Sequence, residues 1–175
     1  DCKKMVFLQW NHPNMPWDGT ELVLADIEAN GSISNEKSVA GGVDISIFQP
    51  RWSANGDLYY ISDKTNWWNI YRYRDGKAEN ITPANAEFGY PQWVFGLSNY
   101  DFVEKGNKKY IVCTYCQNGK KYLATLDLES LELKNFDMPF NSYNYVQGYK
   151  NRAYFIGGSP TLANSLVELD IDSGK

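Results

Sequence analysis

Short apolar and aromatic segments recur along the whole chain, and polar turn residues separate them. The segments are rich in Val, Ile, Tyr, Phe and Trp, which are the residues favoured in β-strands. No stretch of about twelve residues or more carries an apolar stripe at helical spacing. The pattern therefore predicts an all-β protein.

The clearest repeating unit runs from residue 47 to residue 82. A strand ending at Arg51-Trp52 precedes the turn Asn55-Gly56, and further strands are expected over 57–62, over 68–74 and up to Ile81. The dipeptide Asp75-Gly76 supplies the last hairpin turn. Four antiparallel strands of this length form one blade of a β-propeller.

The same order repeats over residues 99–136. Gly106-Asn107 and Asn118-Gly119 mark hairpins between strands expected over 109–116, 122–128 and 131–136. The innermost strand of this blade has two candidates. Pro91-Gln92-Trp93 echoes Pro50-Arg51-Trp52, whereas the turn at Gly106 favours a strand nearer 99–103.

Both ends of the chain carry incomplete blades. Strands are expected over 5–10, 21–27 and 36–40 at the start, without an innermost strand, and over 143–147, 152–156 and 165–171 at the end, without a fourth. The prediction is a β-propeller fragment, a single domain over 1–175 of four-stranded antiparallel blades, two full and two partial, that cover 1–42, 43–85, 86–140 and 141–175. Because a closed propeller has roughly four to eight blades, we expect a longer parent protein and self-association through open strand edges.

The composition narrows the class of partner. The 175 residues are 43% hydrophobic and 15% aromatic, and 17 basic against 21 acidic residues give a net charge of −4. No basic stripe and no long apolar run appear, so neither nucleic acid nor a membrane is expected as a partner. Three cysteines, too few for a disulfide scaffold, and a start without a signal peptide predict a cytoplasmic protein.

Catalysis is not predicted within the chain. His12 is the only histidine and stands beside Pro13, in a loop too structured for a mobile base, and no G-x-S-x-G motif is present. Cys113 and Cys116 have the spacing of a redox or metal pair, but positions three apart on a strand face opposite sides, so we interpret them as structural. One histidine and one cysteine pair are too few for a zinc site, and no metal or other cofactor is expected.

The two ends of the predicted blades differ in their loops. One end receives only short turns, whereas the other receives loops rich in Trp, Pro and carboxylates over 11–18, 64–67, 87–91 and 159–161. Binding usually resides in long loops of this kind. The alternative is that these Trp and Pro residues only pack and rigidify the loops.

Four sequence runs within and beside these loops carry a family resemblance. They are H-P-N-M-P-W-D-G at 12–19, P-R-W-S at 50–53, W-W-N-I-Y at 67–71 and P-Q-W-V-F-G at 91–96. They resemble the propeller of bacterial acylaminoacyl-peptidase-like and dipeptidyl-peptidase-like members of the prolyl oligopeptidase family of serine peptidases. The resemblance implies a C-terminal α/β-hydrolase domain in the parent protein, and a non-catalytic propeller that admits short peptides and excludes folded proteins.

A substrate site can be hypothesised on the loop-rich end. Glu87 is expected to attract the amino terminus of a short peptide, and Trp17, Trp67 and Trp68 to form an apolar wall. His12 lies in the same group of loops.

A second function remains open, in which the chain is a free-standing TolB-like propeller scaffold that binds a protein or sugar partner. A gene that ends shortly after the last complete blade would favour the scaffold. A G-x-S-x-G motif after a strand further downstream would favour the peptidase.

Overall fold

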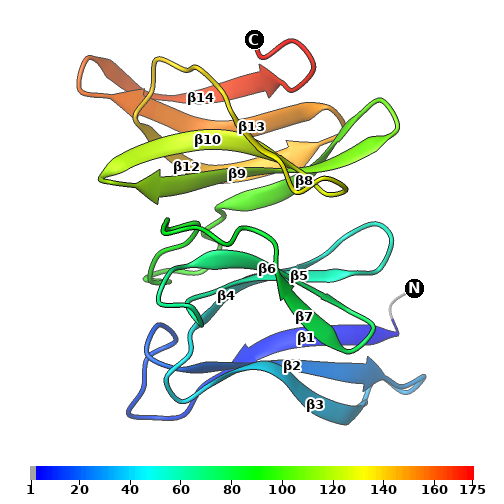
Figure 1. The fold of residues 1–175 in the computed structure, drawn as a ribbon. Coiled ribbons are helices and arrows are strands. Elements are labelled where there is room, and N and C mark those ends of the chain that lie inside the picture. Colours follow the sequence, from blue (N-terminus) through cyan, green and yellow to red (C-terminus); the bar gives the residue numbers. More distant parts are fainter. Residues whose placement is uncertain (1–2) are drawn as a thin grey trace. The chain divides into compact units, whose positions relative to one another are not determined.

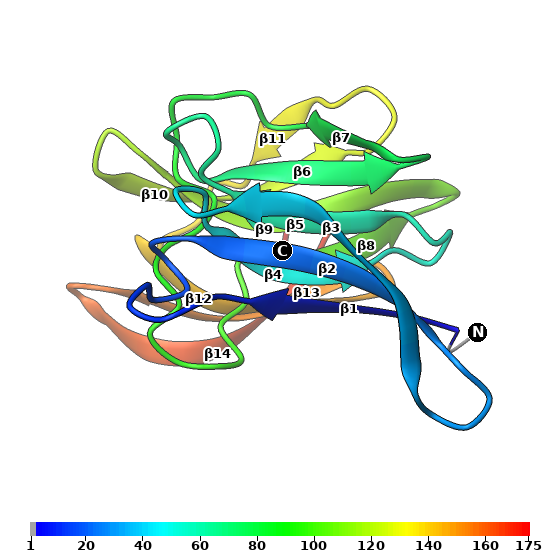
Figure 2. The same cartoon turned by 90° about the horizontal axis from the view of Figure 1, so that it is seen from below.

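The computed structural model describes residues 3–175, and these residues form fourteen β-strands without a helix (Figure 1). The all-β prediction is confirmed. The strands make four antiparallel sheets in which each strand pairs with the next along the chain. Figure 2 shows the same sheets from below.

Two of the sheets have three strands and two have four. The first sheet contains β1 (Lys4–Gln9), β2 (Thr20–Ile27) and β3 (Ile33–Gly42). The second contains β4 (Ile47–Trp52), β5 (Leu58–Ser62), β6 (Asn69–Arg74) and β7 (Lys77–Asn80). The third contains β8 (Tyr100–Lys105), β9 (Lys108–Gln117), β10 (Lys120–Asp127) and β11 (Leu133–Asn135). The fourth contains β12 (Ser142–Tyr149), β13 (Arg152–Ser159) and β14 (Leu162–Asp170).

The chain divides into two compact units. The first runs to Pro83 and includes Gly89–Trp93, so it holds the first two sheets. The second comprises Ala84–Phe88 and Val94–Lys175 and holds the other two. The short segment 84–93 therefore contributes to both units.

The core of the first unit lies between its two sheets. Leu22 of the first sheet packs in one cluster with Ile47, Leu58, Tyr60 and Tyr71 of the second. The rings of Tyr60 and Tyr71 stack with centroids 5.5 Å apart. Every side chain of β5 is buried, as expected for a central strand covered on both faces.

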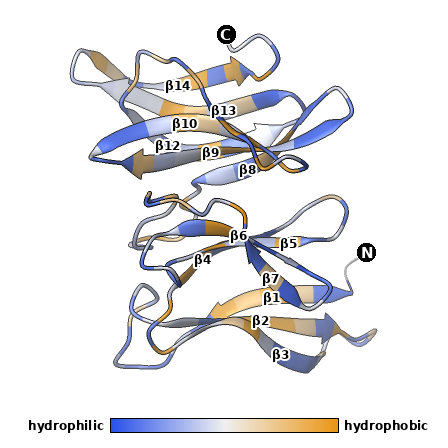
Figure 3. Ribbon diagram, in the orientation of Figure 1, coloured by the Kyte–Doolittle hydropathy of each residue, from blue (hydrophilic) through white to orange (hydrophobic). Residues whose placement is uncertain are grey.

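The second unit has a core of the same kind. Val103 and Val112 of the third sheet cluster with Val146, Phe155 and Leu169 of the fourth. The outer strands β3 and β7 add no buried residue to these two clusters, and Figure 3 shows both as largely hydrophilic. β3 and β7 therefore depend more on backbone pairing than on apolar burial.

The tight turns confirm the positive φ angles expected from their sequences. Asp75-Gly76 has φ angles of 51° and 78°, and Asn118-Gly119 has 52° and 76°. Two further turns use an Asp that ends a strand: Asp127 Oδ1 accepts the backbone N–H groups of Glu129 and Ser130 at 2.8 and 3.1 Å. Asp170 Oδ1 accepts those of Asp172 and Ser173 at 3.0 and 2.9 Å. These carboxylates fix the chain reversals.

The structure settles the choice of innermost strand in the third sheet. The strand is β8, which starts at Tyr100, and residues 91–93 do not belong to a strand. Two outer strands are longer than predicted. β3 was expected over 36–40 and β14 over 165–171, yet they begin at Ile33 and Leu162. Their added first residues are mostly exposed and mix apolar with polar side chains, so no apolar alternation marked them.

Candidate functional site

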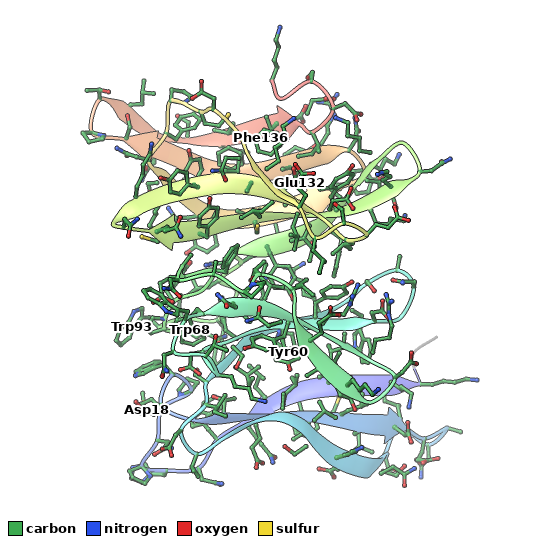
Figure 4. The ribbon with its side chains drawn as sticks, viewed as in Figure 1. Asp18, Tyr60, Trp68, Trp93, Glu132 and Phe136 are labelled. Atoms are coloured by element: carbon green, nitrogen blue, oxygen red, sulfur yellow. The ribbon has the colours of Figure 1, made fainter. Side chains whose placement is uncertain are left out.

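Three segments form the loop-rich end of the first unit. They are the β1–β2 connection, the β5–β6 connection and the segment 89–93. Figure 4 shows Asp18, Trp68 and Trp93, one from each segment, on the same side of this unit. The loops that the sequence singled out in this unit are therefore brought together.

The β1–β2 connection is held by its own hydrogen bonds. The N–H of Asn14 donates to Asn11 O at 3.0 Å, the N–H of Met15 to Asp18 Oδ2 at 2.8 Å, and the N–H of Asp18 to Met15 O at 2.9 Å. Asn14 Nδ2 also donates to Val43 O at 3.1 Å, which ties the loop to the turn after β3. The His12–Pro13 peptide bond is cis. A loop with this many internal contacts presents its side chains in a fixed arrangement.

The first residue of β2 and the residue directly before β4 bind this loop. Ser46 Oγ donates to Pro16 O at 2.7 Å, and the hydroxyl of Thr20 donates to the same carbonyl. Gly19 fits tightly, since a Cβ there would stand 2.1 Å from Val43 O. The loop position therefore depends on a residue without a side chain at 19.

Aromatic rings link the segment 89–93 to the other two segments. Trp93 packs on Trp17 with ring centroids 4.4 Å apart and planes tilted by 49°. Tyr90 packs on Phe48 at 6.0 Å, and Trp68 meets the same Phe48 edge-on at 6.4 Å. Phe48 is buried, so it anchors both of these rings.

Gly89 allows this approach. A Cβ at position 89 would lie 2.9 Å from Ile61 Cγ2 and 3.1 Å from the Trp68 ring. The absence of a side chain thus lets the segment 89–93 lie directly on β5 and the β5–β6 loop.

The predicted site residues fall into the two units. His12, Trp17, Trp67 and Trp68 belong to the first unit, with His12 and Trp67 exposed and the other two half-buried. Glu87 belongs to the second unit. There its backbone N–H donates to Cys116 O at 2.8 Å and its carbonyl accepts from the N–H of Cys116 at 2.9 Å. The half-buried Glu87 is thereby fixed at the end of β9.

Trp93 is a candidate that the sequence-based site did not include. It is 69% exposed although one side packs on Trp17. The available signal was its position directly after the loop 87–91. Its contact with Trp17 is a tertiary contact that no local pattern encodes.

The loop-rich end of the first unit has a local excess of negative charge. Residues 5–36 contain no Lys or Arg, whereas Asp18 and Glu21 stand within or beside the β1–β2 loop. The β5–β6 connection adds Asp63 and one basic residue, Lys64. Glu21 accepts a hydrogen bond from Gln9 Nε2 at 2.8 Å. The surface beside Trp17 therefore suits a cationic or neutral group better than an anionic one.

Metal and thiol chemistry find no support in the described part of the chain. Within residues 3–175, no three His, Cys, Asp or Glu side chains gather as a metal site would require. Cys113 and Cys116 are both free; burial raises the pKa of Cys113 to about 12, so that thiol stays protonated. Cys2 lies outside the described residues. No helix that could span a membrane occurs within residues 3–175.

The second unit contains a cavity of about 470 Å³ with lining groups of both charges. Figure 4 shows Glu132 and Phe136, which lie at its wall. Lys105, Asp127 and Asp172 also line it, but Asp127 caps the turn at 129–130, and those N–H groups hold its pKa below the ordinary value. None of the predicted site residues lines this cavity.

Comparison with known proteins gives matches among solved structures. No family model matches the chain, and no curated protein does. A puromycin-hydrolyzing peptidase from Mycobacterium tuberculosis is similar over 99% of this chain, with 32% identity and a TM-score of 0.89. The chain spans 26% of the length of that peptidase.

Two more distant structures share the fold. A prolyl endopeptidase matches 98% of the chain and 24% of its own length at 15% identity, with a TM-score of 0.70. TolB from Acinetobacter baumannii matches 99% of the chain and 40% of its own length at 19% identity, with a TM-score of 0.68. At such identities these two show the fold alone. The four sheets are blades of the β-propeller type, as the sequence predicted.

Proposed function

The chain corresponds to part of the propeller of prolyl-oligopeptidase-family peptidases, and from this premise we propose that it gates and selects substrates for a serine peptidase. The observation that carries the proposal is the likeness to a puromycin-hydrolyzing peptidase over nearly the whole chain. In this proposal the parent protein carries the catalytic α/β-hydrolase domain, and the propeller limits entry to short peptides.

The chemistry of the chain supports a non-catalytic role. His12 is its single histidine and lies exposed in a loop, and the chain has no G-x-S-x-G motif. A serine nucleophile needs an adjacent base that a third group orients. We therefore place the nucleophile and base outside these residues.

The loop-rich end of the first unit supports the selecting role. Its loops are fixed by internal hydrogen bonds and by aromatic packing, so they can discriminate between ligands with little loss of conformational entropy. Exposed Trp side chains are typical of binding surfaces. In the proposal, Trp17, Trp67 and Trp68 provide apolar contact to a bound peptide, and His12 borders it.

Glu87 is proposed to attract the amino terminus of the substrate peptide. Its backbone is paired with Cys116, so the main chain from which its side chain extends is fixed. A carboxylate favours a protonated amine over an acetylated one.

The gating proposal is tested with the full-length product of the gene. We expect cleavage of reporter peptides to decline steeply with peptide length, and folded proteins to resist cleavage. Puromycin is a useful further substrate, since the similar peptidase hydrolyses it. Equal rates on a short peptide and on a folded protein would contradict gating.

A matched pair of variants tests the role of Glu87. Glu87→Gln removes the charge and keeps the shape, so kcat/KM for free-amine reporters should fall about tenfold, while the value for acetylated reporters changes little. Glu79→Gln, on the outer strand β7, serves as the control. An unchanged ratio between the two reporters in Glu87→Gln would remove this role.

The scaffold alternative keeps one observation in its favour, the shared fold with TolB. A full-length product that binds a protein or sugar and cleaves no peptide would support it. Because the likeness to the puromycin-hydrolyzing peptidase is much greater, 32% against 19% identity, we favour the peptidase.

A further inference from the structure

We propose that Trp17 and Trp93 together bind an aromatic side chain of the substrate peptide. This inference rests on the proposed peptidase function. It adds a residue, Trp93, and a substrate preference that the proposed function leaves open.

The rings of Trp17 and Trp93 contact each other at an angle. Their centroids are 4.4 Å apart and their planes are tilted by 49°, so the space between the two planes widens away from the contact. Trp93 stays 69% exposed, and so most of its surface is available to a ligand. A third aromatic ring can add to such a pair in an edge-to-face or offset arrangement, which aromatic rings favour.

Backbone hydrogen bonds and a buried ring hold the segments that carry Trp17 and Trp93. Trp17 is carried by the hydrogen-bonded β1–β2 loop, and the N–H of Trp93 donates to Pro91 O at 3.0 Å. Tyr90 is anchored on the buried Phe48. Exposed tryptophans on a rigid support lose little entropy when a ligand binds, whereas tryptophans on a mobile loop would lose more.

The charge beside Trp17 and Trp93 limits the charge of the peptide that can bind there. Asp18 follows Trp17 directly, and Figure 4 shows its position on the same side of the unit as Trp93. No Lys or Arg occurs between positions 5 and 36. The carboxylate of Asp18 therefore suits a peptide with an unblocked amino terminus and disfavours an acidic one. The aromatic preference rests on the two rings themselves.

The test uses the full-length product and two free-amine reporters with the same leaving group, one with phenylalanine and one with alanine. The measured quantity is the ratio of their kcat/KM values. In Trp93→Ala this ratio should fall about tenfold, because loss of an apolar contact to the side chain affects only the phenylalanine reporter. Trp93→Phe should restore most of the ratio.

Trp52→Ala is the matched control. Trp52 is a tryptophan of the same unit, 37% exposed, at the end of β4 that leads into the short turn 53–56. This change should leave the ratio as in the unmodified protein. Trp17→Ala is a second test of the same pair, and Trp93→Phe controls for a general loss of packing on Trp17.

The possible outcomes separate this inference from the proposed function. If the protein cleaves both reporters and the ratio stays within twofold in Trp93→Ala, the aromatic site is wrong and the peptidase proposal stands. If the unmodified full-length protein cleaves no peptide at all, the proposed function is wrong, and this inference fails with it.

Discussion

Asp57 and Arg74 form the ion pair whose loss should be felt most in the first unit. Arg74 Nε donates to Asp57 Oδ1 at 2.8 Å and its Nη2 donates to Oδ2, while Asn55 Nδ2 adds a bond of 3.1 Å. The Asp57 side chain is nearly buried. The hydrogen bonds from Arg74 hold the pKa of Asp57 below its ordinary value of 3.8.

Removal of this pair should lower stability in a pH-dependent way. We expect Arg74→Met to reduce the free energy of unfolding by about 1–2 kcal/mol at pH 7. Since the folded pKa of Asp57 is depressed, its contribution is present above about pH 4 and is lost as the pH falls through the folded pKa. Urea unfolding at pH 7 and at pH 3 measures both effects.

The control for this prediction is Lys4→Met in the same unit. Lys4 pairs with Asp26 at 2.8 Å, but both side chains are exposed, so the loss of stability should be clearly smaller than in Arg74→Met. Equal losses in the two variants would contradict the role given to Asp57.

The two described cysteines should differ in reactivity. Cys113 is fully buried and its thiol has a raised pKa, whereas Cys116 is half-buried. In a Cys2→Ser background at pH 8, iodoacetamide should therefore modify Cys116 and spare Cys113. Mass spectrometry of the labelled peptides gives the result, and comparable labelling of both residues in the folded chain would count against the assigned burial.

Single residues were predictable from sequence where the signal is local. Asp75-Gly76 and Asn118-Gly119 adopt the positive φ angles that their turns require. The Trp17–Trp93 contact was not predictable, because it depends on how the segment 89–93 lies on β5. Glu87 and the four other proposed site residues remain predictions.

Several strands, including β1, β2, β4 and β5, appear within one residue of their expected bounds. Among them, β5 is a nearly continuous apolar run whose side chains are all buried. β3 and β14 were predicted to begin later than they do, because their first residues are mostly exposed and mix apolar with polar side chains. The innermost strand of the third sheet needed the turn at Gly106 to distinguish it from the echo at Pro91.

The outer edge of β14 leads to a prediction for the isolated chain. Among the described residues β14 pairs only with β13, and Leu166 in its middle is 74% exposed. Open, apolar strand edges promote pairing between chains, and a lysine on the edge opposes it. We therefore expect the chain to associate with itself and Leu166→Lys to reduce the association, as measured by sedimentation velocity.

Val43→Lys is the matched control for this edge. Val43 is 77% exposed and lies in the turn after β3, away from the middle of any strand. It introduces the same charge without occupying an edge. If Val43→Lys reduced association as much as Leu166→Lys, net charge would explain the effect and the β14 edge would not.

At the scale of the whole molecule, the chain spans about a quarter of the peptidase it resembles, 26% of that length. The fold class followed from a repeating pattern in the sequence, because each blade repeats the same order of strands and turns. The family resemblance followed from loop motifs such as the run at 12–19. The function of the parent protein does not follow from either, since one fold serves many functions and activity resides in particular sites.

The most direct test compares peptidase activity of the 175-residue chain with that of the full-length product of its gene, on acylated and free-amine dipeptide reporters. A gating propeller predicts activity in the full-length product alone, and its abolition by a serine-directed phosphonate. Inactivity of both proteins, or activity in the short chain, would contradict the account.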